Sequence, residues 1–180
     1  QHLAMQDDKY SITEKGWAKQ RWTIAFAKDK VDGCSVDKNN ELTWKYSVYY
    51  DKSMTGNPNS QDEFASDIYK TGKLLTAGWS GMSGGDCKKI NKELNIEKRF
   101  GITDVTLSGG CVKGNAKKKI AFDEMGRPMW TISTVGGGIK RPYDRLVKKD
   151  CSITITDKRG NQTTITIEKE SGFASIKENS

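Results

Sequence analysis

The sequence feature that most constrains the fold is a pair of alternating segments near the C-terminus, residues 151–156 and 162–168. Apolar and polar side chains alternate in both, and a polar connection at residues 157–161 contains a glycine and an asparagine. A period of two on either side of such a turn predicts a β-hairpin. One face would be packed and the other would face water. The packed face would carry Ile153, Ile155, Ile165 and Ile167, and the wet face Thr154, Thr156, Thr164 and Thr166.

Other parts of the chain alternate in the same way and predict about five further strands. These strands follow one another without a repeated helix, which favours antiparallel sheets over a doubly wound α/β fold. A length of 180 residues fits a single domain, residues 1–180, with its own core. We therefore expect a mainly β (α+β) fold in which a short N-terminal helix end packs on two antiparallel β-sheets with long loops. The further strands are expected at residues 22–26, 42–50, 102–107, 120–122 and 129–134.

Short helices and one irregular segment are expected between the strands. Residues 1–10 contain a short helical segment, and residues 61–70 are compatible with another. Residues 87–100 predict an exposed helix that ends at Gly101. Residues 53–85 are rich in glycine and turn-forming residues, so we expect an extended loop insertion there. Loops of this length are usually functional or mobile, and this one is a candidate contact surface for partner proteins.

The cysteine pattern bears on the cellular compartment. Cys34, Cys87, Cys111 and Cys151 are scattered along the chain, and none is spaced as C-x-x-C. An even number of scattered cysteines predicts two disulfides in an oxidising compartment. The alternatives are a structural zinc site, for which His2 is the sole imidazole, and four buried thiols in a cytosolic protein. Three connectivities exist for two disulfides, and we favour Cys87–Cys111, which flank the same helix and strand, with Cys34–Cys151 as the second pair.

The sequence predicts no enzyme, no cofactor and no metal site. His2 is the one histidine and lies at a terminus, where a Ser-His-Asp or Cys-His arrangement would be built on a residue that frays. The adjacent carboxylates Asp62–Glu63 and Asp123–Glu124 lie beside turns, where charged residues are normally solvated. The glycines at 81–85 and 136–138 lack the lysine and hydroxyl context of a phosphate-binding loop.

Charge gives a sharper functional indication. The net charge is +7, and a cluster of basic residues falls within a ten-residue stretch close to residues 117–119, which are all lysines. Clusters of this kind bind nucleic-acid phosphates through counterion release, so DNA is one candidate partner. A solvated loop, a lipid-facing loop and a contact for an acidic partner subunit are the alternatives. The candidate contact residues are Lys140, Arg141, Tyr143, Arg145, Lys148 and Lys149, which we call the basic loop.

Several short patches resemble a known family. One is the strand and turn formed by Ile120, Phe122, Gly126, Arg127 and Pro128, followed by the Ile/Thr hairpin that closes on residues 171–172. Others are residues 1–10 and 17–26, and residues 62–67 with 72–75. Together they cover about half of the chain. They resemble the globular head domain of the type IV pilin-like minor pseudopilins, the group shared by the H-type subunits of type II secretion and the T-type fimbrial minor pilins.

This resemblance implies an anchored bacterial protein. The head would lie in the periplasm, held at the inner membrane by an N-terminal helix that is missing from this sequence, since no stretch of about 20 apolar residues occurs in it. A prepilin peptidase would cleave the full-length protein, and its new N-terminus would be methylated. The subunit would then assemble near the tip of a pseudopilus in protein export, in contact with other pseudopilins and secretion-apparatus proteins.

Two other functions remain as alternatives. The first is a minor pilin of a DNA-uptake apparatus, in which the basic loop touches DNA. The DNA-contacting arginines of that group lie near the C-terminal end, where this sequence has Gly-Phe-Ala-Ser at residues 172–175. The second alternative is a free periplasmic ligand-binding β domain.

Overall fold

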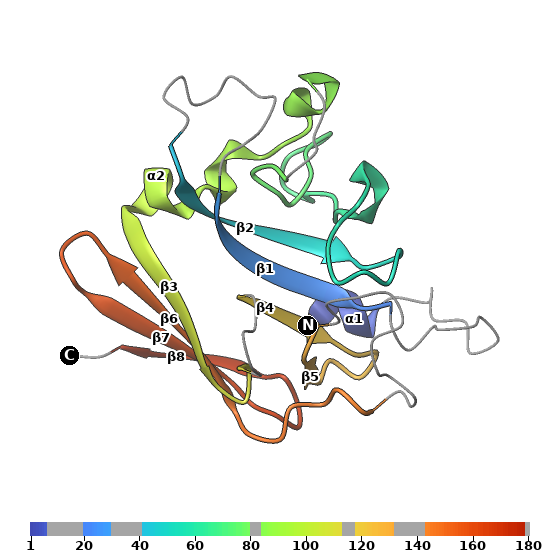
Figure 1. The fold of residues 1–180 in the computed structure, drawn as a ribbon, viewed down its shortest axis with the longest axis vertical. Coiled ribbons are helices and arrows are strands. Elements are labelled where there is room, and N and C mark those ends of the chain that lie inside the picture. The colour runs from blue at the N-terminus through green and yellow to red at the C-terminus, as the bar shows by residue number, and fades with distance from the viewer. Residues whose placement is uncertain (7–19, 30–40, 80–83, 113–117, 132–142, 179–180) are drawn as a thin grey trace.

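The computed structural model describes residues 1–6, 20–29, 41–79, 84–112, 118–131 and 143–178. Two four-stranded antiparallel sheets dominate these parts of the chain (Figure 1). The first sheet has the strand order β2-β1-β4-β5 and the second has the order β3-β6-β7-β8. The mainly β prediction with two antiparallel sheets is therefore confirmed. The strands are Trp22–Asp29 (β1), Thr43–Tyr50 (β2), Ile102–Gly109 (β3), Lys119–Phe122 (β4), Pro128–Met129 (β5), Cys151–Asp157 (β6), Gln162–Ile167 (β7) and Ala174–Glu178 (β8).

The predicted C-terminal hairpin is confirmed as β6 and β7. Ile153 lies opposite Ile165, and Thr154 lies opposite Thr164 with 3.2 Å between their Oγ1 atoms. The turn uses Gly160 at a φ of 86°, a left-handed conformation that glycine adopts without a steric penalty. β8 was not predicted, and it extends the hairpin by pairing with β7. Of the strand expected at 129–134, the structure forms β5, and residues 132–134 lie outside the described residues.

The core lies between the two sheets. It is a single cluster of buried apolar side chains to which both sheets, α1 (His2–Met5) and α2 (Ile96–Phe100) contribute. Burial of apolar surface at roughly 25 cal/mol per Å² is the main source of stability for such a cluster. From the first sheet come Phe26, Trp44, Ile120 and Phe122, and from the second come Val105, Cys151, Ile153 and Ile167.

The helices are shorter than expected. Within residues 61–70 the structure forms one 3-10 turn, Gln61–Glu63, rather than a helix. Residues 87–100 are divided among two 3-10 turns, Gly84–Lys88 and Lys92–Leu94, and helix α2. Neither of the two predicted helices is therefore present as a single element. The side chains of Asn91 and Asn95 accept hydrogen bonds from the backbone amides of Glu93 and Lys98 and so begin new helical turns. α2 ends as predicted at Gly101, at a φ of 70°. No helix in the described segments is long and apolar enough to cross a membrane.

The described part of residues 53–85 contains no strand and, before residue 84, only the 3-10 turn Gln61–Glu63, so the predicted loop insertion is confirmed. Their described part lies along the outer edge of β2, together with residues up to 95. Isolated bridges join Tyr49 to Phe64, Ser47 to Thr76 and Lys45 to Asn95. An unpaired strand edge is a template for aggregation, so this insertion protects the first sheet on one side.

The outer edges of β3 and β5 are also covered, that of β3 in part. At β3, the Trp44 indole Nε1 donates to the carbonyl of Thr103 over 2.7 Å, and Lys118 Nζ donates to the carbonyl of Val105. At β5, the amide of Val147 donates to the carbonyl of Pro128, and the amide of Trp130 donates to that of Arg145. Side chains therefore bond to two carbonyls of one edge, and a returning segment of chain pairs with the other.

The disulfide pairing differs from the prediction. Cys111 bonds to Cys151, so the predicted pairs Cys87–Cys111 and Cys34–Cys151 are both wrong. The reason is the register of β3 against β6, which places Gly109 opposite Cys151 and leaves Cys111 beside it, with 4.9 Å between the two Cα atoms. Cys87 is also disulfide-bonded, and Cys34 lies outside the described residues.

Removal of the Cys111–Cys151 bond tests its contribution to stability. The bond spans a sequence separation of 40, for which chain entropy predicts a stabilisation of up to about 4 kcal/mol. We expect the double substitution Cys111→Ala with Cys151→Ala to lower the free energy of unfolding in urea by about 2–4 kcal/mol. The far-ultraviolet circular dichroism of the folded variant should match the original, because β3 and β6 remain paired. A loss below about 1 kcal/mol would contradict this role.

Candidate functional site

Three segments that are distant in the sequence meet at one corner of the molecule, which we call the N-terminal corner: residues 1–5, 123–128 and 168–173. Ala4 of α1 is fully buried in the core between the sheets. The side-chain amide of Gln1 donates a hydrogen bond to the backbone carbonyl of Ser171. α1 is too short to be stable alone, so its helical conformation depends on these contacts.

Two glycines make this close approach possible. A Cβ atom at Gly126 would lie 2.9 Å from Gln1 Cγ and 2.9 Å from Met5 Sδ. A Cβ atom at Gly172 would lie 2.0 Å from the carbonyl oxygen of Gly126. The two turns therefore touch each other through backbone atoms, and the backbone of Gly126 touches the side chains of Gln1 and Met5. Gly126 and Gly172 belong to the patches that carry the family resemblance, and the structure brings both against the N-terminal patch.

A buried carboxylate organises the turn at residues 123–128. Asp123 is 1% exposed, and its Oδ1 accepts hydrogen bonds from the amides of Met125 and Arg127 over 3.0 and 2.8 Å. Its Oδ2 accepts one from Arg127 Nε over 2.8 Å. The adjacent Glu124 lies 3.8 Å from the guanidinium of buried Arg21. The expectation of solvated carboxylates is therefore wrong here, because amide and guanidinium donors replace water.

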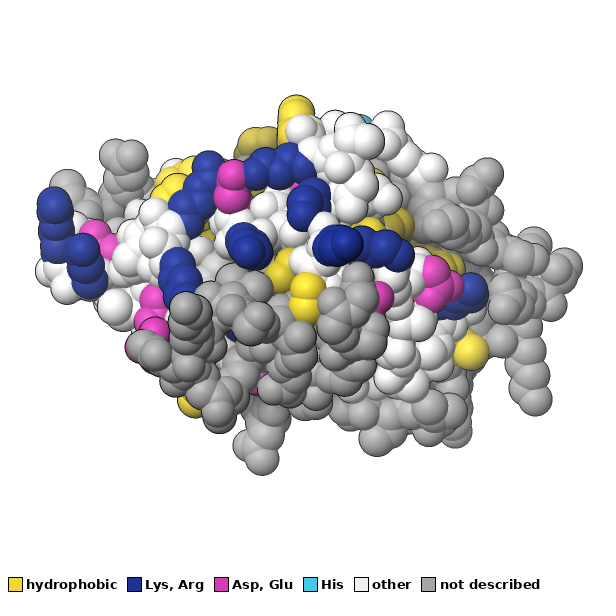
Figure 2. All heavy atoms as spheres, turned by 90° about the horizontal axis from the view of Figure 1, so that it is seen from above, with side chains coloured by type: hydrophobic (Ala, Val, Ile, Leu, Met, Phe, Trp, Pro, Cys, Tyr) yellow, Lys and Arg dark blue, Asp and Glu magenta, His cyan; other side chains and the backbone are white. Residues whose placement is uncertain are grey.

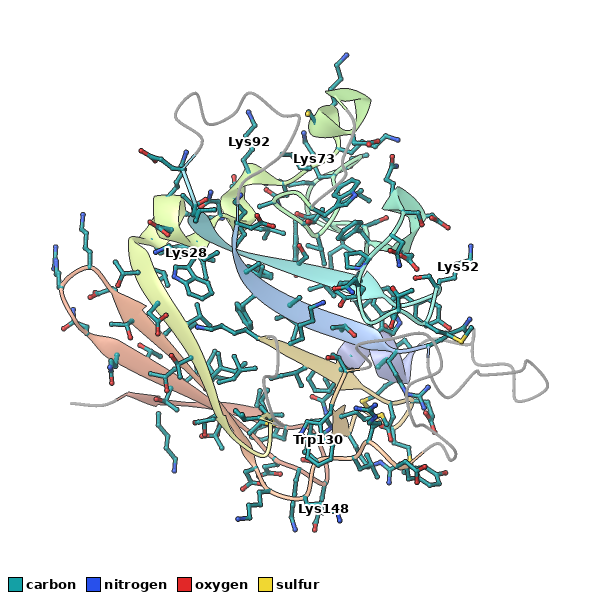
Figure 3. The ribbon with its side chains drawn as sticks, in the orientation of Figure 1. Lys28, Lys52, Lys73, Lys92, Trp130 and Lys148 are labelled. Carbon is teal, nitrogen blue, oxygen red and sulfur yellow. A yellow bond between two sulfur atoms is a disulfide. The ribbon has the colours of Figure 1, made fainter. Side chains whose placement is uncertain are left out.

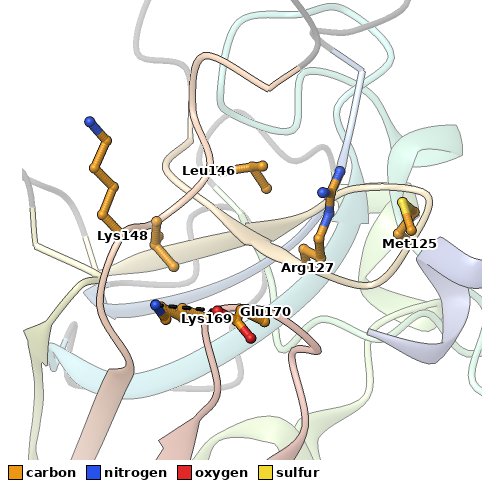
Figure 4. A pocket seen from close by; sticks show the side chains of 7 residues that line it. Met125, Arg127, Leu146, Lys148, Lys169 and Glu170 are labelled. Carbon is orange, nitrogen blue, oxygen red and sulfur yellow. Dashed lines mark ion pairs between the residues drawn. The ribbon is translucent and has the colours of Figure 1, made fainter.

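A surface hollow of about 510 Å³ lies between the same two turns (Figure 4). Arg127 on its wall is bound to Asp123, and Lys169 pairs with Glu170 over 3.3 Å. These two charges are engaged with neighbouring carboxylates, and the hollow offers a ligand apolar contacts together with the exposed Lys148. It is lined by Met125, Arg127, Leu146, Val147, Lys148, Lys169 and Glu170.

The structure describes four of the six residues of the predicted basic loop. Lys148 and Lys149 are exposed, whereas Arg145 is half-buried and its guanidinium donates to the carbonyl of Thr131 over 3.5 Å. Tyr143 is 56% exposed, and the Arg127 guanidinium lies 5.0 Å from its ring centroid. Lys140 and Arg141 lie outside the described residues. Among the described residues, this loop thus presents two exposed lysines and one exposed aromatic ring.

A second basic surface was not predicted. It is formed by the insertion, by the residues between the insertion and α2, and by α2 itself, and we call it the upper basic surface. Lys73 and Lys92 point away from the sheets at the opposite end of the molecule from Lys148 (Figure 3). Seen from that end, Lys and Arg side chains gather in a band with few Asp or Glu among them (Figure 2). The surface contains Lys70, Lys73, Lys88, Lys89, Lys92, Lys98 and Arg99.

Few carboxylates neutralise the upper basic surface. Glu93 is paired with both Lys70 and Arg99. Lys73 donates to the backbone carbonyl of Lys88, and Lys89 donates to the side-chain oxygen of Gln61 over 2.9 Å, so both hydrogen bonds go to neutral acceptors. Exposed cations spaced in this way raise the local concentration of anionic partners.

Sequence reasoning missed this surface because its members come from separate segments. Lys73 and Lys89 are far apart in the chain, and the amide of Leu74 bonds to the carbonyl of Lys89 over 2.8 Å and brings the segments together. A window of ten residues shows no cluster there. The insertion itself, residues 53–85, carries two basic and three acidic residues, so neither the count nor the density of basic residues there predicts this surface.

Two buried carboxylates organise the start of the insertion. Asp51 accepts hydrogen bonds from the amides of Thr55 and Gly56, over 3.0 and 2.7 Å. Glu63 is 2% exposed and accepts hydrogen bonds from the amides of Ser53 and two further loop residues. Glu63 is therefore buried rather than solvated, unlike the adjacent exposed Asp62. Desolvation, with Glu63 nearby, raises the pKa of Asp51 to about 6.

The described residues do not assemble a metal site. They contain no group of three or more His, Cys, Asp or Glu side chains that could hold a metal ion. His2 is exposed on α1. The carboxylates of Asp51, Glu63 and Asp123 all accept hydrogen bonds from backbone amides of their own turns. Their arrangement is that of structural carboxylates.

The N-terminal corner is tested by a matched pair of glycine substitutions. Gly172 and Gly160 both have positive φ, 69° and 86°, so alanine costs about 1–2 kcal/mol of backbone strain at either position. Nothing lies within 4 Å of a Cβ at Gly160, whereas Gly172 would clash with Gly126. We expect Gly172→Ala to lower the free energy of unfolding at least about 2 kcal/mol more than Gly160→Ala does. Equal losses in urea titrations would show that the corner is not tightly packed.

Asp51 should make stability depend on pH. Its folded pKa of about 6 lies above its ordinary value of 3.8, so its stabilising contribution is full below about pH 4 and is lost as the pH rises through 6. Relative to Asp51→Asn, the original chain should lose about 2 kcal/mol between pH 4 and pH 7.

The free energy of unfolding is measured in urea at several pH values for the original chain and for Asp51→Asn. The contributions of all other titrating groups cancel in the difference between the two proteins. Asp157→Asn serves as a control of opposite sign, since hydrogen bonds from Asn161 and Arg159 lower the pKa of Asp157. A flat difference curve for Asp51→Asn would contradict the raised pKa.

The chain was also compared with known proteins. No protein-family model, no curated protein and no solved structure matches it.

Proposed function

We propose that this chain is the head domain of a type IV pilin-like minor pseudopilin, with a structural role in a type II secretion pseudopilus. The observation that supports this most directly is the N-terminal corner. There the segment that resembles the end of a stalk helix is packed against both glycine turns that resemble the family's head. A stalk joined to the head in this way would move with it as one rigid body.

The geometry of the corner favours a mechanical role for the N-terminus. Ala4 is fully buried between the sheets, and Gln1 bonds to Ser171 at the last hairpin turn. A force on the N-terminal segment is thus transmitted to the core and to the C-terminal sheet rather than to a free linker. The head would act through contacts with other pseudopilins, in the periplasm, and would carry no reaction.

Processing of the full-length gene product tests this proposal. Co-expressed with a prepilin peptidase, the protein should be cleaved ahead of an apolar N-terminal helix, gain an N-terminal methyl group and remain in the inner-membrane fraction. Intact-protein mass spectrometry and fractionation measure these outcomes, with an inactive peptidase as the control. A product that is never processed, or whose gene encodes no such helix, would exclude a pseudopilin.

A second candidate function is DNA binding as a minor pilin of an uptake apparatus. The observation that favours it is the upper basic surface, where the ammonium groups of Lys73 and Lys89 are hydrogen-bonded to neutral acceptors in the described part of the chain. Tyr69 is 90% exposed beside Lys70, and Phe100 is 60% exposed beside Arg99, so aromatic rings flank the cations. The predicted basic loop, with Lys148 at the other end of the molecule, is the alternative contact.

Titration with labelled duplex DNA at about 50 and 200 mM salt separates these surfaces. If the upper basic surface binds DNA, joint substitution of Lys88, Lys89 and Lys92 by Gln should reduce the slope of log affinity against log salt by about 3. Joint substitution of Lys140, Arg141, Lys148 and Lys149 by Gln should leave the slope unchanged. The opposite result would assign DNA to the basic loop, and no binding at low salt would exclude both.

A further inference from the structure

The described residues cover three of the four sheet edges in whole or in part and leave β8 open. The insertion covers β2, Trp44 and Lys118 bond to two carbonyls of β3, and the chain near Val147 pairs with β5. β8 pairs with β7 on one side, and in the described part of the chain no strand or side chain hydrogen-bonds to its other side. An open edge displays a row of backbone donors and acceptors that can pair with another strand.

The register determines which backbone groups point outward from β8. At the hairpin turn the amide of Glu168 donates to the carbonyl of Phe173 over 2.9 Å, so these two residues form a hydrogen-bonded pair. Hydrogen-bonded and non-hydrogen-bonded pairs alternate along antiparallel strands. Ser175 and Lys177 therefore bond to β7, opposite Thr166 and Thr164. The amides and carbonyls of Ala174, Ile176 and Glu178 point away from the sheet.

Apart from Lys177, the side chains of β8 give this edge little protection. Ile176 at its centre is 67% exposed, on the same face as Ile165 across the ladder. Phe173, just before the strand, is 59% exposed. The strand contains no proline and its pairing with β7 shows no bulge, two of the devices that usually blunt an edge.

We propose that β8 pairs antiparallel with β8 of a second copy of this chain, around a two-fold axis at Ile176. The β3-β6-β7-β8 sheets of the two copies would then form one continuous sheet. An interface of this symmetry is self-complementary, because each residue meets its counterpart in reverse order. Ile176 lies opposite Ile176 of the second copy, and Ala174 lies opposite Glu178.

This register satisfies both hydrogen bonding and charge. The outward-pointing residues 174, 176 and 178 face one another, so their amides and carbonyls pair across the axis. Lys177, the one lysine of the strand, faces Ser175 rather than another lysine. Ile176 gains an apolar partner on the face where it is now exposed. The strand is short, so the interface falls in the small, weakly associating class, and pairing should depend on concentration.

Sedimentation analysis over a range of protein concentrations tests the proposal. The mass of the original chain should rise from 20.1 kDa towards twice that value. Ile176→Pro removes the outward amide donor and leaves the bonds to β7 in place, so that variant should remain a monomer with an unchanged melting temperature. Ile176→Val keeps the donor and should still dimerise. A mass of 20.1 kDa at every concentration, or dimers that persist in Ile176→Pro, would overturn the proposal.

Cysteine cross-linking reads out the register directly. Residues in a hydrogen-bonded antiparallel pair have Cα atoms about 5.5 Å apart, within the range of a disulfide. Under mild oxidation, Ile176→Cys should therefore form an intermolecular disulfide in high yield. Ser175→Cys, whose counterpart is Lys177, should give little. Equal yields would show that the strands do not pair in this register and would also overturn the proposal.

Discussion

The position of Trp44 is the constraint on which much of the rest depends. Its backbone amide donates to Glu97 of α2 over 2.9 Å, and its indole Nε1 donates to the carbonyl of Thr103 in β3 over 2.7 Å. The ammonium of Lys118 lies 4.4 Å from its ring centroid. One residue, 5% exposed, thus connects the first sheet through its backbone to α2 and through its side chain to the edge of the second sheet.

Residues near one another in sequence were predicted well. The hairpin of β6 and β7 follows from alternation and a glycine turn, which are local properties, so the pairing of Ile153 with Ile165 was expected. The end of α2 at Gly101 was likewise a local signal. Where the conformation is decided by the next few residues, the amino-acid pattern was sufficient.

Features decided by long-range packing were not predicted. The Cys111–Cys151 bond depends on the register between β3 and β6, and no spacing in the sequence reports that register. The insertion looked irregular because its glycines and turns do not alternate, yet bridges from Phe64, Thr76 and Asn95 lay it along β2. The upper basic surface likewise depends on long-range contacts, because they bring its separate segments together. The candidate site was therefore predicted in part. The sequence pointed to Gly126 and to the turn at residues 171–172, but not to the contact between them.

The carboxylates of Asp51 and Glu63 have a consequence for how this surface can vary. Together they accept the amides of Ser53, Thr55, Gly56, Asn59 and Ser60, so two acidic side chains from the interior hold the backbone path of this loop. The side chains of Ser53, Thr55 and Asn59 add hydrogen bonds to one another and to a backbone carbonyl of the loop. Because interior carboxylates and the loop's own polar side chains both hold this backbone path, the loop presents one preformed shape to anything that contacts it, and substitutions at these positions would change that shape together with the surface.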